Sequence, residues 1–264
     1  MSVISSEKIL LSERKANIAY LTLNRPDVLN ALNKQLLLEI KKELEDIKGS
    51  SEIQAVVISG AGNKAFSAGA DIEYLNQASP LEVRELANLA VSVNQLIENL
   101  NKISIALING FALGGGLELA ESCMFRVAVS TARLGHPEVR IGVVAGWGGT
   151  TRLPRLIGKG RAAELLLTGK MIDANEALHL GLIHRVTDAQ NLNREGERFL
   201  QEILQNSPLA VNLSWEAIHR GLDLSVDEST KLGADYFGLV ASSEDFREGT
   251  RSFLDKRKAD FKGK

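Results

Sequence analysis

The chain has 264 residues, of which 44% are hydrophobic and 24% charged, and its formal net charge is −2. This composition is typical of a soluble globular protein, and the near-neutral charge gives no support for broad nucleic-acid or membrane-surface binding. The single cysteine, Cys123, has no partner for an intrachain disulfide, which fits a reducing compartment. No apolar run is long enough to cross a bilayer and no secretory leader is visible, so a cytoplasmic location is expected.

Hydrophobic patterning predicts an α/β protein in which strands come first and helices dominate later. Strands are expected at 18–23, 55–59 and 103–108, with weaker candidates at 125–129 and 182–186. Amphipathic helices are expected at 36–47 and 83–100, and a loop at 60–69. Beyond about residue 160 the helical patterns lie at 162–167, 192–204 and 208–222. This order predicts an α/β core with a helical C-terminal extension.

The expected strand at 103–108 leads directly into a glycine-rich segment that runs from Asn109 to Ala120. Its consecutive glycines, 114–116, expose backbone N–H groups that a bulky side chain would block. The next residues, 117–120, are the start of an expected helix. A ligand oxygen placed there would meet free amides and the positive end of the helix dipole. Glu118 then lies within reach of whatever molecule carries that oxygen.

A second glutamate, Glu138, follows 20 positions later in the segment Gly-His-Pro-Glu. Glu118 is flanked by leucines, and an unpaired carboxylate on an apolar stretch is costly, so it needs a partner or a role. The two carboxylates on their own would also suit a glycosidase. Glu121, one turn after Glu118, is interpreted as a solvated or ion-paired helix residue. His136, beside Glu138, is interpreted as a packing residue or a residue one layer behind the site, with a place in the lining of the site as the alternative.

Several other kinds of site are excluded by the residues themselves. The glycine segment lacks the dinucleotide pattern Gly-x-Gly-x-x-Gly, and a P-loop around 158–159 lacks its first glycine and its Ser/Thr. The segment at 65–69 resembles a nucleophile elbow but has Ala65 in place of the first glycine, which makes Ser67 a loop serine. The histidines show no metal-ligand spacing, so no metal site is expected. Trp147, between two glycines, is interpreted either as a cover for the substrate or as a cap on the core.

Taken together, these segments resemble the enoyl-CoA hydratase (crotonase) family over nearly the whole chain. The resemblance is carried by Leu23–Pro26, Leu29–Leu32, Phe66–Ile72, Asn109–Ala120, Gly135–Glu138, Gly146–Leu153, Leu167–Gly169, Ala174–Leu182 and Arg247–Lys258. It implies a spiral of strand–strand–helix turns over residues 1–198, which holds the active site. It also implies a helical region at 199–264 that assembles a homotrimer or homohexamer.

The resemblance implies a 2-enoyl-CoA hydratase, which adds water to the 2,3 double bond of an acyl-CoA thioester without a metal or redox cofactor. In that family two backbone N–H groups hold the thioester oxygen, and by motif they fall on Ala70 and Gly115. Glu118 would orient water and take its proton, while Glu138 would deliver a proton to C2. The family often has proline where this chain has Ala145, which leaves the shape of the acyl pocket open.

The remaining residues implied by the resemblance bind coenzyme A. Ala68, Ala70 and Ile72 would present backbone to its adenine end, and the basic run that includes Lys256 would meet its phosphates. Phe237 and Phe253 match aromatic positions near the ligand. A double-bond isomerase or another acyl-CoA enzyme of the family is the alternative function, and an RNA-binding or scaffold protein is a distant one. The sequence does not define the preferred acyl chain length or the pathway.

Overall fold

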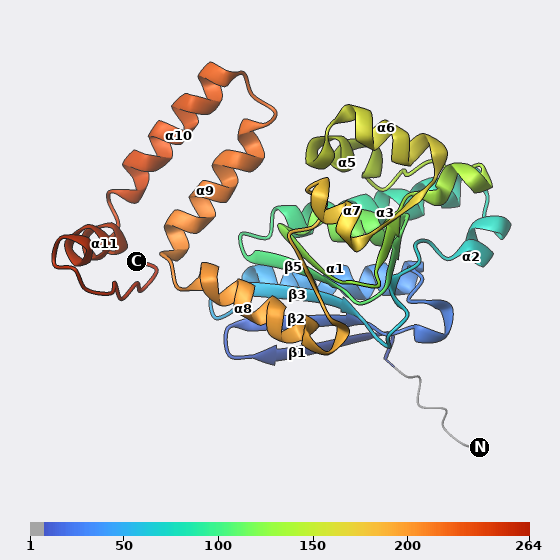
Figure 1. Ribbon diagram of the computed structural model, residues 1–264, viewed down its shortest axis with the longest axis horizontal. Helices are drawn as coiled ribbons and strands as arrows, with labels where there is room; N and C mark the ends of the chain where they lie inside the picture. Colours follow the sequence, from blue (N-terminus) through green and yellow to red (C-terminus); the bar gives the residue numbers. More distant parts are fainter. Residues whose placement is uncertain (1–7) are drawn as a thin grey trace. The chain divides into compact units, whose positions relative to one another are not determined.

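The computed structural model describes residues 8–264, which form two compact units (Figure 1). The first unit extends to Gly196 and the second comprises Glu197–Lys264. Helix α8 (Leu192–Leu204) contains the division between them.

Two sheets form the framework of the first unit. The larger has the order β1-β2-β3-β5-β7-β10, and the smaller has the order β4-β6-β8-β9. Only the β1–β2 and β8–β9 pairs are antiparallel. The strands of the larger sheet are β1 (Leu10–Lys15), β2 (Ile18–Leu23), β3 (Ala55–Gly60), β5 (Ile103–Ile108), β7 (Phe125–Val129) and β10 (Arg185–Thr187). Those of the smaller sheet are β4 (Ala65–Ser67), β6 (Phe111–Leu113), β8 (Arg133–Gly135) and β9 (Met171–Asp173).

Helices connect and cover these strands. They are α1 (Lys34–Gly49), α2 (Ile72–Gln77), α3 (Pro80–Glu98), α4 (Gly115–Ser122), α5 (Gly149–Ile157), α6 (Lys159–Thr168) and α7 (Ala174–His179). Short 3-10 helices occur at η1 (Pro26–Val28), η2 (Pro137–Ile141) and η3 (Ala189–Asn191).

The connections follow a repeating course. The chain runs through β3, β4 and α3, then β5, β6 and α4, then β7 and β8 before η2 and α5. Each turn therefore places one strand in each sheet, and the parallel pairing of β3, β5 and β7 stacks successive turns. This arrangement confirms the predicted α/β spiral of strand–strand–helix turns.

Most predicted elements lie where the pattern places them, including β2, β5 and β7. The predicted loop at 60–69 contains the short strand β4, and the candidate strand at 182–186 starts three residues later as β10. Leu182 and Ile183 instead turn back onto α7, where both backbone amides donate to Ala177 O. Strand β1 was not predicted, because beyond Leu10 its residues are exposed and show no apolar alternation.

Two helices show how local sequence fixes the elements around the site. Helix α3 begins with a capping box, in which the Ser79 side chain accepts from the Glu82 amide and Glu82 accepts in return from Ser79. Its apolar face is buried against α1 and α4. Helix α4 is buried along its whole length, so the carboxylates of Glu118 and Glu121 both lie in the interior.

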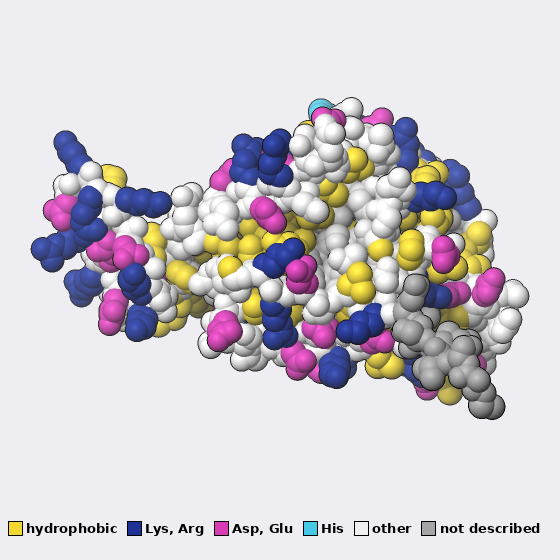
Figure 2. Space-filling model, turned by 90° about the horizontal axis from the view of Figure 1, so that it is seen from below, with side chains coloured by type: hydrophobic (Ala, Val, Ile, Leu, Met, Phe, Trp, Pro, Cys, Tyr) yellow, Lys and Arg dark blue, Asp and Glu magenta, His cyan; other side chains and the backbone are white. Residues whose placement is uncertain are grey.

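The second unit is helical. It contains α9 (Pro208–Gly221) and α10 (Val226–Val240), which pack side by side as a hairpin, and α11 (Glu244–Leu254). Ser207, Ser225 and Ser243 cap these three helices through their side chains. Within residues 8–264 no helix has both the length and the apolar character needed to cross a membrane. On the face shown in Figure 2, basic and acidic side chains are interspersed.

Candidate active site

A cavity of about 520 Å³ opens in the first unit between the segment that follows β4, the helices α2, α3 and α4, and η2. Its walls are mostly apolar, and its ionisable lining residues are Glu118 on α4 and Glu138 and Arg140 on η2. Six of the residues predicted from the sequence line it: Ala68, Ala70, Ile72, Gly115, Glu118 and Glu138. The structure therefore brings together, in one unit, the predicted carboxylate pair and the predicted backbone donors.

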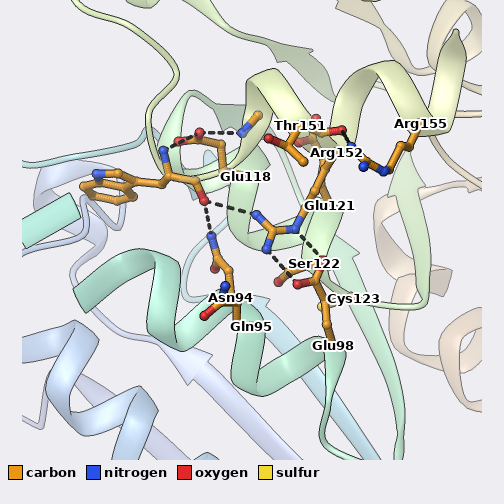
Figure 3. Close-up of polar contacts among 12 residues, drawn as sticks. Asn94, Gln95, Glu98, Glu118, Glu121, Ser122, Cys123, Thr151, Arg152 and Arg155 are labelled. Carbon is orange, nitrogen blue, oxygen red and sulfur yellow. Dashed lines mark hydrogen bonds and ion pairs between the residues drawn. The ribbon is translucent and has the colours of Figure 1, made fainter. Parts of the chain in front are cut away.

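Glu118 lies on the first turn of α4 and is 2% exposed. Its Oε1 accepts hydrogen bonds from the backbone amides of Trp147, at 2.8 Å, and Gly149, at 2.7 Å (Figure 3). Burial raises the pKa of Glu118 to about 7, although the Gly149 hydrogen bond and the nearby His136 oppose the shift. A carboxyl group with this pKa exchanges a proton readily at neutral pH.

This raised pKa predicts a stability effect. Because the folded protein binds the Glu118 proton more tightly, stability falls as pH rises from about 4.5 to 7 and stays low above it. Glu118→Gln removes the titration and keeps an oxygen for the two amides. We expect the difference in unfolding free energy, variant minus wild type, to increase by about 2–3 kcal/mol from pH 5 to pH 8. Denaturant unfolding at four pH values measures this; the partly exposed Glu164→Gln is the control, and a pH-independent difference contradicts the prediction.

The backbone of Trp147 is held at both its N–H and its C=O. While its N–H holds Glu118, its carbonyl accepts from Asn94 Nδ2 at 3.0 Å and from Arg152 Nη1 at 3.1 Å. Arg152 is held in turn by a two-pronged ion pair with Glu98, at 2.6 and 2.8 Å. The loop before α5 is thus positioned by α3 and α5, and it sets the orientation of the Glu118 carboxylate.

Glu138 enters the cavity from the first turn of η2. Both of its carboxylate oxygens are buried and, among residues 8–264, neither has a hydrogen-bond partner. Its Oε1 lies 3.6 Å from His136 Nδ1. The carboxylate rests against Gly114, where an added Cβ would lie 2.9 Å from Oε1 and where φ is +48°. Glycine at 114 therefore meets a conformational need and also leaves room for the carboxylate.

His136 and Glu121 form a fully buried ion pair behind Glu138. Nε2 of His136 lies 2.9 Å from Glu121 Oε1, and both side chains are 0% exposed. Burial alone would lower the pKa of His136, but the charge and hydrogen bond of Glu121, helped by Glu138, raise it to about 10. The ion-paired interpretation of Glu121 is confirmed and the solvated one is wrong, because α4 has no exposed face.

The predicted backbone donors lie on neighbouring segments. Gly69 has φ +106°, and a Cβ added there would lie 3.4 Å from the Gly115 nitrogen, so the segment that carries Ala70 runs beside the start of α4. Leu32 pins this segment by donating to Gly69 O at 2.8 Å and accepting from the Asp71 amide at 3.1 Å. Within the described part of the chain, neither the Ala70 nor the Gly115 amide donates to a protein acceptor. Their role in holding a thioester oxygen stays a prediction.

Trp147 lines the cavity and is 8% exposed, so its indole packs into the core, and its role as a cover for the substrate stays a prediction. A Cβ added at Gly115 would lie 2.5 Å from one ring atom of Trp147 and 2.6 Å from another. The indole therefore lies directly against the Gly115 backbone. The close approach requires glycine at 115, and the ring narrows the cavity beside the predicted donor.

The other predicted coenzyme A residues belong to the second unit. Phe237 and Phe253 are 74% and 83% exposed, and Lys256 is exposed with φ +53°. Phe237 lines an apolar groove formed within that unit by α9, α10 and α11. A role for these three residues in binding coenzyme A stays a prediction.

The sequence analysis missed two parts of the site. The amides of Trp147 and Gly149 hold Glu118, a contact across about 30 residues that no local pattern encodes. The Glu121–His136 pair was not assigned, although one signal was present. Because the glycine segment and the apolar residues after it predict a buried helix, a second carboxylate one turn after Glu118 needs a buried cation.

Comparison with known proteins agrees with the fold. Residues 13–264 match the family model described as enoyl-CoA hydratase/isomerase. The chain is 44% identical to the crotonyl-CoA hydratase of Syntrophomonas wolfei, over 97% of this chain and 98% of the relative. It is 41% identical to the short-chain-enoyl-CoA hydratase of Clostridium acetobutylicum, over 94% and 95% of the two chains. A crystal structure of an enoyl-CoA hydratase from Bacillus anthracis superimposes with a TM-score of 0.93 at 35% identity, over 97% of this chain and all of the other.

The spiral of paired strands and the buried glutamates at a glycine-rich helix start define a protein of the crotonase fold. With the family model matching almost the entire chain, the protein belongs to the enoyl-CoA hydratase/isomerase family.

Proposed function

We propose that the protein is an enoyl-CoA hydratase that converts a 2-enoyl-CoA thioester to the 3-hydroxyacyl-CoA. The observation that carries this proposal is the meeting of the buried Glu118 and the largely buried Glu138 carboxyl group in one cavity beside the backbone amides of Ala70 and Gly115. Relatives that match over nearly the whole chain are named as hydratases, which supports it.

The chemistry follows from this arrangement. The two amides hold the thioester oxygen and stabilise the negative charge that develops on it, which makes C3 electrophilic. One O–H bond of water breaks as its oxygen bonds to C3, a C2–H bond forms, and the double bond becomes single, so no net proton is gained or lost. Glu118 orients the water and takes its proton, and Glu138 delivers a proton to C2. Because the two groups share one water and interact, they act as a coupled pair.

We propose that these groups act without a metal or a redox cofactor, since hydration changes no oxidation state and the carboxyl pair supplies the proton transfers. A double-bond isomerase can operate with one carboxylate, so the presence of both favours hydration. A salt-sensitive RNA shift without hydratase activity would favour the distant RNA-binding alternative.

We propose a short acyl chain as the preferred substrate, supported by the indole of Trp147 against Gly115 and by the short-chain relatives. We expect the wild type to hydrate crotonyl-CoA fastest in a series of 2-enoyl-CoA thioesters whose acyl groups have about 4, 6 and 10 carbons. Trp147→Ala removes the ring and should raise the relative kcat/KM for the longest substrate about tenfold, the scale of a few methylene groups in an apolar pocket. Trp147→Phe is the matched control. Absence of hydration with every thioester contradicts the function, and an unchanged preference in Trp147→Ala contradicts the role of the ring.

We propose that the chain assembles as a homotrimer or homohexamer through residues 199–264. The apolar groove of about 420 Å³ in the second unit, lined by Phe237, Tyr236, Val240 and Phe246, supports an interface there. Light scattering at micromolar concentration should give three or six times the mass of the chain. A monomer contradicts the proposal.

A further inference from the structure

Behind the catalytic pair lies a row of buried ionisable groups that the hydration chemistry above does not use. Glu121 contacts His136 at 2.9 Å, and the other ring nitrogen of His136 lies 3.6 Å from Glu138 Oε1. Glu121 and His136 are 0% exposed, and Glu138 is 13% exposed at the cavity. The row therefore leads from Glu121, on the buried helix α4, through His136 to the Glu138 carboxyl group at the cavity.

The Glu138 carboxyl group depends on this row for its stabilisation and its orientation. Its two buried oxygens have no hydrogen-bond partner within residues 8–264, and the one ion pair that it makes there is with His136. A buried carboxyl group without hydrogen bonds is neither stabilised nor fixed in direction. The Nδ1 of His136 is also buried and lacks a closer partner, so the two groups are complementary.

Glu121 determines the state of the imidazole. The strong contact at Nε2, away from solvent, favours a ring that is protonated on both nitrogens, and such a ring can only donate. Donation from Nδ1 to Oε1 leaves Oε2 free for proton exchange whether Glu138 is neutral or ionised. The other charged groups around this row are Glu118 on the same helix, and Arg126 and Arg152, which act on Glu121.

We propose that His136, held as a cation by Glu121, is the positioning residue that fixes the Glu138 carboxyl group for proton transfer to C2. The proposal rests on the proposed hydratase function for its catalytic readout. The separation at Nδ1 is 3.6 Å, and we expect it to shorten to a hydrogen bond in the substrate complex, as catalytic contacts commonly do.

The test compares His136→Gln, Glu121→Gln and the double variant by crotonyl-CoA hydration over pH 6–9. His136→Gln should lower kcat about ten- to a hundredfold at every pH and change KM less than twofold, the effect of losing one hydrogen bond to a charged group. In Glu121→Gln the imidazole loses the contact that keeps it charged. Its kcat should be closest to that of the wild type at pH 6 and fall as pH rises, which gives a new alkaline limb. His179→Gln, an exposed histidine at the end of α7, is the matched control and should behave as the wild type.

The double variant separates positioning from packing. Each single variant leaves one buried group of the pair without its charge partner, whereas the double variant leaves two neutral amides that can bond to each other. We expect it to regain stability relative to His136→Gln but to keep the low kcat. A double variant that regains wild-type kcat, or folded single variants with wild-type kcat and pH profile, would overturn the proposal.

A readout that needs no activity distinguishes failure of this proposal from failure of the proposed function. Nitrogen-15 NMR of the histidine side chains should show His136 protonated on both nitrogens at pH 8 in the wild type and on one nitrogen in Glu121→Gln. A neutral His136 in the wild type overturns the proposal even if hydration is efficient. A doubly protonated His136 in a protein that hydrates no thioester contradicts the hydratase function, and it leaves the Glu121–His136 ion pair established. If His136→Gln does not fold, Glu121→Gln and the wild-type spectrum still decide.

Discussion

Glu118→Gln and Glu138→Gln should each lower the rate of crotonyl-CoA hydration by at least about a hundredfold, the scale of general acid–base catalysis. The amide keeps the size of the side chain and, at position 118, an oxygen for the amides of Trp147 and Gly149. It cannot exchange a proton. The loss should therefore fall on kcat, with KM changed little. Steady-state kinetics with the purified protein measures both constants.

The double Gln variant should lose less than the product of the two single effects, because groups that act as a unit are strongly non-additive. Glu121→Gln looks from the sequence like a neutral control, but it is unsuitable, since Glu121 is buried against His136. Glu164→Gln, on the half-exposed face of α6, serves instead. Near-normal turnover in either single variant would remove that residue from the mechanism.

Gly115→Pro should lower turnover about a hundred- to a thousandfold, the cost of removing one donor from an oxyanion site. Proline is well tolerated at the first position of a helix, which is where Gly115 lies, and it removes only the N–H there. Its ring must also fit beside Trp147, so folding and oligomeric state have to be checked by circular dichroism and light scattering. Coenzyme A binding, measured by calorimetry, should survive.

The obvious comparison, Gly115→Ala, needs a second change. An alanine Cβ would lie 2.5 Å from the Trp147 ring, so the single variant displaces the indole even though it keeps the N–H. Gly115→Ala in a Trp147→Ala background relieves the clash and isolates the amide. That variant should retain far more activity than Gly115→Pro in the same background. Equal activity of the two would mean that the Gly115 amide does not polarise the thioester.

The sequence predicted the parts of the fold that local patterns encode. Strand β3 is a continuous apolar run and α3 has a strong helical period, so both were found. Strand β6, at 111–113, lies inside the glycine segment and consists of three residues, too few for any period to show. Strand β1 is exposed almost throughout and exists through its antiparallel pairing with β2. Such elements depend on partners that are distant in sequence or on edges that carry no apolar signal.

The site was predictable to the same extent. Glu118, Glu138 and Gly115 lie in segments that resemble the enoyl-CoA hydratase family in their glycines and flanking residues. They line one cavity as expected. The contacts that orient them were not predictable. The amides that hold Glu118 come mainly from the loop before α5, and His136 beside Glu138 is held by Glu121 on α4. Nothing in a single sequence links positions so far apart.

The backbone of Trp147 joins the Glu98–Arg152 ion pair to the Glu118 carboxylate, because its C=O accepts from Arg152 and its N–H donates to Glu118. Glu98 and Arg152, which do not line the cavity, should therefore affect the rate of turnover and be under selection for it. In a random-mutagenesis screen for activity, substitutions at 98 or 152 should therefore be recovered among the inactive variants together with those at 118. Suppressors of such losses should arise at Asn94, the other side chain that holds this carbonyl. For engineering, the loop is better redesigned together with α3 than as a separate surface segment.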